Sequence, residues 1–136
     1  MIDLTQIEGL SDRKIGEKCA IFGIYGRKGL QAARLTYFGL YTQQHRGQES
    51  SGISASNGKK INTHKALGLV TQVYNEENLK QLKGHMAIGH NRYSTSGGSH
   101  DSHSQPVTSR RGSNDVLVLA HNGNLPVDDN LSKFLI

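Results

Sequence analysis

The sequence changes character at a short apolar run that reads Cys19-Ala20-Ile21-Phe22-Gly23-Ile24-Tyr25-Gly26. Eighteen mostly polar residues precede it, and Cys19 is the only cysteine of the chain. The run predicts a buried β-strand over residues 20–25. Cys19 is then either a small buried residue with an inert thiol or a nucleophile that a free α-amine at a new chain start serves as base. The second alternative makes residues 1–18 a leader, or propeptide, that is removed.

Composition narrows the class of protein. The 136 residues suffice for one domain, and one cysteine permits no internal disulfide. No apolar run approaches the ~18 residues of a membrane span, and residues 1–18 lack the apolar stretch of a signal peptide. We therefore expect a soluble cytoplasmic protein without membrane contact. The net charge is +5, but the basic residues are scattered, so we expect no nucleic-acid partner.

Apolar spacing predicts the elements of the first half of the chain. An amphipathic helix is expected over residues 30–44. Asn57-Gly58 is typical of a tight hairpin turn, so the flanking segments 52–55 and 61–64 should pair as antiparallel strands.

The second half of the chain is predicted to contain a short helix, two strands and a long loop. Asn75 can cap a short helix through Leu82, and a strand is expected over residues 86–93. Residues 94–111 show no period and predict a long surface loop, whereas residues 116–120 predict a fully buried strand. The total is roughly five strands and three helices.

The last residues predict a helix that stops early. Asp128 or Asp129 can cap it, but it ends within two turns on Phe134, Leu135 and Ile136. Exposed apolar residues of this kind need a packing partner. We therefore favour the explanation that the sequence is the front piece of a longer protein over the alternative that a second copy of the chain buries them.

Three polar segments follow predicted elements and carry candidate chemistry. In the first, Arg46 stands beside Gly47. In the second, Arg92 can hold a carboxylate with two hydrogen bonds, and the Thr95 hydroxyl can add a third contact. The third contains Asn122-Gly123, read either as a hairpin turn or as the two donors of an oxyanion hole. No strand follows this pair, because Pro126 leads into the last helix, so the oxyanion hole is favoured.

Taken together, these segments resemble the glutaminase domain of the amidophosphoribosyltransferase family. Its members are class II glutamine amidotransferases of the N-terminal nucleophile hydrolase superfamily and catalyse the committed step of purine synthesis. Other class II amidotransferases share the leading cysteine, an arginine segment and an Asn-Gly pair. The segments that carry the resemblance, in chain order, are Cys19, Gln44-His45-Arg46-Gly47-Gln48-Glu49-Ser50-Ser51-Gly52-Ile53, Gly89-His90-Asn91-Arg92-Tyr93-Ser94-Thr95 and Ala120-His121-Asn122-Gly123-Asn124-Leu125.

The resemblance implies an α+β fold, an αββα sandwich of antiparallel sheets between helices, incomplete at its C-terminus. Residues 19–136 would be the front part of the glutaminase domain, and the phosphoribosyltransferase domain would be absent. It further implies that glutamine is hydrolysed to glutamate and ammonia for transfer to phosphoribosyl pyrophosphate. The roles implied are catalytic for Cys19, Asn122 and Gly123, and substrate-binding for Arg92, Thr95, Arg46 and Gly47.

Two departures qualify the resemblance. The family usually has glycine after the nucleophile, where this chain has Ala20. The family's acidic residue for the glutamine α-amino group would lie beyond position 136, and we expect little or no synthase activity from this chain alone.

The family resemblance also predicts which cofactors and partners to expect. We expect no metal or cofactor here: His100, Asp101 and His103 could bind a metal ion, but no further ligand pair lies near them in sequence. Mg²⁺ is expected with the absent domain, and a homo-oligomer with the complete enzyme. One alternative is a catalytically inactive binding or assembly module, in which Cys19 stays internal. The other is the glutaminase part of another class II amidotransferase.

Overall fold

The computed structural model describes residues 19–93 and 103–123. The expected leader, Thr95, the pair His100 and Asp101, and the helix expected after Asp128 lie outside the described residues. The elements in chain order are β1 (Ala20–Tyr25), α1 (Ala32–Thr42), the 3₁₀ helix η2 (Gln44–Arg46), β2 (Ser50–Ser56), β3 (Ile61–Leu67), α2 (Val70–Val73), α3 (Glu76–Gln81), β4 (Met86–Arg92), β5 (Val107–Arg111) and β6 (Asn114–Leu119).

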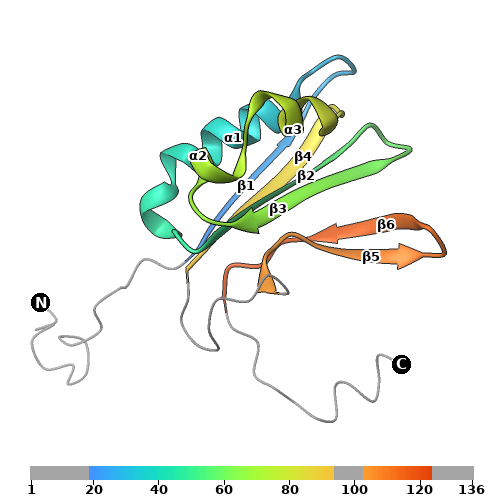
Figure 1. Cartoon of the computed structure of the whole chain (residues 1–136). Coiled ribbons are helices and arrows are strands. Elements are labelled where there is room, and N and C mark those ends of the chain that lie inside the picture. The colour runs from blue at the N-terminus through green and yellow to red at the C-terminus, as the bar shows by residue number, and fades with distance from the viewer. Residues whose placement is uncertain (1–18, 94–102, 124–136) are drawn as a thin grey trace, which may run out of the picture.

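The described part is built in layers around one antiparallel sheet. Its four strands run in the order β1-β4-β2-β3, and β5 and β6 form a separate two-stranded sheet. The helices cover one face of the larger sheet, and the β5–β6 hairpin lies on the other side (Figure 1). This arrangement confirms the predicted α+β class with antiparallel sheets.

Local turn chemistry explains the β2–β3 hairpin. The Asn57 side-chain oxygen accepts hydrogen bonds from the backbone N–H groups of Lys59 and Lys60, both at 2.9 Å. Gly58 has φ +88°, which glycine adopts without strain. Ser56 therefore pairs with Ile61, and the predicted hairpin is confirmed with longer strands than expected.

The core lies between α1 and the sheet. Leu40 of α1 and Ile53 of β2 are fully buried. Gly39 and Gly89 let helix and sheet approach closely: a Cβ at Gly89 would lie 2.5 Å from the Thr36 methyl group. This close contact holds α1 against the sheet, and the C-terminal end of α1 lies near the start of β2 and the end of β4. The candidate site is formed there.

Two expectations about the chain were wrong, and one element was not predicted. Residues 107–111 are not loop but strand β5, and the short helix α2 was not foreseen. Strand β6 is not fully buried, because Val116 is 56% and Leu117 59% exposed. The β5–β6 hairpin shares no ladder with the larger sheet, and most of its residues are exposed.

Candidate active site

Cys19 stands immediately before β1, beside the end of β4. Its Sγ accepts a hydrogen bond from the Tyr93 N–H at 3.5 Å and lies 3.9 Å from the Tyr93 carbonyl oxygen. Ala20 pairs with Asn91 in the β1–β4 ladder, which brings the two strand ends together. Cys19 has φ +51°, a conformation that costs a residue with a side chain about 1 to 3 kcal/mol. The surrounding contacts therefore hold the cysteine in a conformation that it would not adopt alone.

Arg46 and Gly47 reach the same place from the end of η2. The Arg46 Nε–H donates to the Cys19 carbonyl oxygen at 3.1 Å. A Cβ on Gly47 would lie 2.7 Å from the backbone carbon and oxygen of Asn91, so the close approach of the two backbones requires glycine. The structure thus brings these two predicted residues together with Cys19.

Arg92, the last residue of β4, contacts a carboxylate within the chain. Its Nε lies 3.4 Å from Glu49 Oε2, and its Nη1 donates to the His103 carbonyl oxygen at 3.0 Å. The Arg92 side chain is 16% exposed and that of Glu49 is 9% exposed. The predicted carboxylate-binding arginine is therefore already held on two sides.

Asn91 connects the helix layer to the site. Its side-chain oxygen accepts from the Ser51 hydroxyl at 2.9 Å, and its amide donates to the Leu40 carbonyl oxygen at 2.8 Å. Asn91 is fully buried. It thereby ties β4 to β2 and to α1 one ladder position from Cys19.

The predicted oxyanion donors Asn122 and Gly123 are exposed. The preceding residue anchors them, since the His121 N–H donates to Gln105 Oε1 at 2.7 Å and its carbonyl oxygen lies 3.2 Å from His90 Nε2. Asn122 and Gly123 are therefore connected to Cys19 indirectly, first by the contact between His121 and His90 and then by the β1–β4 ladder.

His90 is held neutral by its surroundings. Burial lowers the pKa of His90 to about 4, although its hydrogen bond to the His121 carbonyl acts in the opposite direction. The ring is 1% exposed, and its Nδ1 has no hydrogen-bond partner in the described part of the chain. A neutral ring with the proton on Nε2 donates to the His121 carbonyl, so His90 serves as an anchor for residues 121–123.

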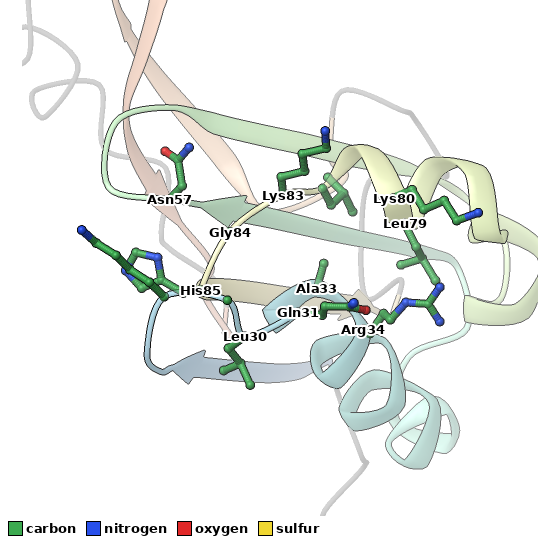
Figure 2. A pocket seen from close by; sticks show the side chains of 13 residues that line it. Leu30, Gln31, Ala33, Arg34, Asn57, Leu79, Lys80, Lys83, Gly84 and His85 are labelled. Carbon is green, nitrogen blue, oxygen red and sulfur yellow. The ribbon is translucent and has the colours of Figure 1, made fainter.

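A cavity of about 520 Å³ lies at the opposite end of the sheet, away from Cys19. Leu30, Leu79 and Gly84 line it together with basic side chains, and no predicted site residue does. Figure 2 shows the amine ends of Lys80 and Lys83 pointing outward in different directions. Because these charges do not converge, this cavity is not the better candidate.

Residues 19–93 and 103–123 contain no group of three or more His, Cys, Asp or Glu side chains placed to hold a metal ion. Within the same ranges, no helix has both the length and the apolar character needed to span a membrane.

Known proteins resemble this chain in sequence and in structure. No family model matches it. It is 46% identical over 122 residues to amidophosphoribosyltransferase of Bacillus subtilis, an alignment that covers 90% of this chain and 24% of that protein. It is 48% identical over 141 aligned positions to the amidophosphoribosyltransferase of Synechocystis, covering 98% of this chain and 28% of that protein.

A solved structure of an amidotransferase is also similar to the chain. Glutamine phosphoribosylpyrophosphate amidotransferase from B. subtilis, in complex with ADP and GMP, matches with a TM-score of 0.67 and 47% identity. The match covers 77% of this chain and 22% of that one. The chain is homologous to the N-terminal region of amidophosphoribosyltransferases. It spans about a quarter of the length of the relatives that it matches.

Sequence reasoning missed several residues of this end of the sheet. Glu49, His90 and Asn91 belong to segments that carry the family resemblance, but the sequence assigned none of them a role in catalysis or substrate binding. One signal was present for Glu49: a carboxylate directly before Ser50, at the start of a strand of small residues and one isoleucine.

Proposed function

We propose that this chain is the front part of the glutaminase domain of an amidophosphoribosyltransferase, with Cys19 as nucleophile. The observation that carries the proposal is the placement of Cys19: a strained residue at the head of β1, with Arg46 on its carbonyl and the Tyr93 N–H on its sulfur. The homology to amidophosphoribosyltransferases supports the same assignment.

Removal of residues 1–18 would give Cys19 a free α-amine, which takes the thiol proton as the sulfur attacks the side-chain amide carbon of glutamine. The Asn122 amide and the Gly123 N–H stabilise the negative oxygen of the tetrahedral intermediate. When the intermediate collapses, the C–N bond breaks and the leaving nitrogen takes the proton, giving ammonia and a thioester. Water then hydrolyses the thioester, which releases glutamate and restores the thiol.

Substrate recognition is assigned to the charged groups near the nucleophile. Arg92 pairs with the α-carboxylate of glutamine, helped by Thr95, while Arg46 and Gly47 shape the pocket beside Cys19. Phosphoribosyl pyrophosphate and Mg²⁺ belong, in this proposal, to a phosphoribosyltransferase domain outside the sequence, so the glutaminase part needs no cofactor. The complete enzyme would be a cytoplasmic homo-oligomer.

A glutaminase assay of the purified chain tests the proposal. Glutamate released from glutamine is measured for the wild type and for Cys19→Ala, and we expect release from the first and none above background from the second. Equal release from both would contradict the assignment of Cys19. No release from either chain, with both folded by circular dichroism, would favour the inactive binding module.

A further inference from the structure

Glu49 carries a buried carboxylate that the mechanism above does not use. Both of its carboxylate oxygens are inaccessible to solvent, and neither has a hydrogen-bond partner in the described residues. Its charged contact there is Arg92, with 3.4 Å between Nε and Oε2. A buried carboxylate is costly unless a nearby charge compensates it, so this side chain depends on Arg92.

The backbone fixes the two residues relative to one another. The Glu49 N–H donates to the Arg92 carbonyl oxygen at 3.0 Å, directly beyond the pairing of Ser50 with Arg92. The Glu49 carbonyl accepts from the Gly68 N–H at 2.8 Å. Glu49 is thus held on both sides by main-chain hydrogen bonds, which place its side chain beside that of Arg92.

The contacts of Arg92 engage two of its three guanidinium nitrogens. Nε faces Glu49, and Nη1 donates one hydrogen to the His103 carbonyl. Within the described part of the chain, Nη2 makes no hydrogen bond. Each of Nη1 and Nη2 carries two N–H groups, so together they can still supply the two parallel hydrogen bonds by which an arginine binds a carboxylate.

We propose that Glu49 is a positioning residue: it orients Arg92 so that the edge containing Nη2 faces the α-carboxylate of glutamine. Glu49 itself does not touch the substrate. The inference rests on the proposed glutaminase function and deepens it, because it names what sets the direction of the substrate-binding arginine.

The test compares the wild type with Glu49→Gln, which keeps the shape and removes the charge, in a steady-state glutaminase assay. We expect the KM for glutamine to rise about tenfold and kcat to stay within about twofold, as for a lost binding interaction that ground and transition states share. Glu76→Gln is the matched control. Glu76 pairs with Arg34 near the other end of the sheet, so its replacement should leave KM unchanged.

A second measurement separates positioning from general damage to the site. The inhibition constant of 4-aminobutanamide, which is glutamine without its α-carboxylate, should be the same in Glu49→Gln and the wild type. If it rises as much as the KM for glutamine, Glu49 supports the fold only and the inference is wrong. If Glu49→Gln does not fold, Glu49→Asp replaces it, with an expected KM increase of about threefold.

The outcomes distinguish this inference from the function on which it rests. An active wild type whose KM is unchanged in the Glu49 variant overturns the role of Glu49 and leaves the glutaminase proposal standing. A folded wild type without glutaminase activity overturns both, and it is recognised before any variant is compared. A KM increase confined to substrates that carry the α-carboxylate supports the inference.

Discussion

At one end of the four-stranded sheet, where β1 begins and β4 ends, polar groups are buried and paired. At the other end, where β1 ends and β4 begins, basic side chains line an open cavity of about 520 Å³. Asn91 and Glu49 belong to the first end, and each has a specific partner. At the second end, the ends of Lys80 and Lys83 point apart (Figure 2).

This difference in burial and pairing distinguishes the candidate active site from the open cavity. Burying polar groups costs free energy unless they are paired, so a cluster of buried polar groups around one cysteine indicates a fixed geometry. A cavity lined by surface cations requires no such precision. The predictions below compare the two ends by substitution, beginning with the largest expected effect.

Gly47→Ala should destabilise the fold most. The new methyl group would lie 2.7 Å from the backbone of Asn91 and 2.9 Å from that of Arg92, so strand or loop must move. We expect a loss of about 3 kcal/mol in the free energy of unfolding, measured by urea denaturation. Gly23→Ala is the control, because a Cβ at this strand position meets nothing within 4 Å. Equal stability of both variants would contradict the close approach at Gly47.

The pH dependence of stability should reveal His90. Its pKa falls from 6.5 in the unfolded chain to about 4 in the fold, so the unfolded chain binds more protons between these values. The stabilisation is fully present above pH 6.5 and is lost as the pH falls toward 4, an effect of roughly 2 to 3 kcal/mol. Urea denaturation across this range should show less loss for His90→Gln. Parallel profiles for variant and wild type would contradict a buried neutral ring.

Asn91→Ala should remove the link between α1 and the strand ends. The Leu40 carbonyl and the Ser51 hydroxyl would each lose a buried partner, and we expect about 2 kcal/mol of destabilisation. Asn57→Ala removes two hydrogen bonds from an exposed turn near the other end and should cost less, because water replaces them. A larger loss for Asn57→Ala in urea denaturation would reverse the comparison of the two ends.

Glu76→Gln should have the smallest effect. The carboxylate pairs with Arg34, but the Glu76 side chain is 67% exposed, so solvent screens the interaction. Arg34 lowers the pKa of Glu76 through its hydrogen bond, yet we expect the urea midpoint to change by no more than its error. A shift as large as that of Asn91→Ala would show that the end with the open cavity also depends on specific pairing.

Much of the fold could be predicted because its signals are local. The apolar run predicted β1 with the observed bounds, and the Asn57-Gly58 turn fixed the pairing of β2 with β3. Strand β5 escaped prediction because its sequence has no apolar alternation and its ladder with β6 is irregular between Ser109 and Arg110. Its pairing depends on β6 rather than on its own residues.

The candidate site was predictable to a similar extent. The motifs and their family resemblance indicated Cys19, Arg46, Gly47 and Arg92, and the structure brings these residues to the same end of the sheet. Their roles, like those of Asn122 and Gly123, stay predictions. The pairing of Glu49 could not be derived from the sequence, because its partner Arg92 is 43 positions away and only the β2–β4 ladder brings the two close.

Covalent labelling of Cys19 tests the central claim most directly. The intact mass of the purified chain is measured with and without 6-diazo-5-oxo-norleucine, a glutamine mimic that alkylates an activated nucleophile, beside Cys19→Ala. We predict loss of residues 1–18 and one adduct on the wild type that is absent from the variant. A folded wild type with its full mass and no adduct would contradict the account of Cys19 as an activated nucleophile in this chain.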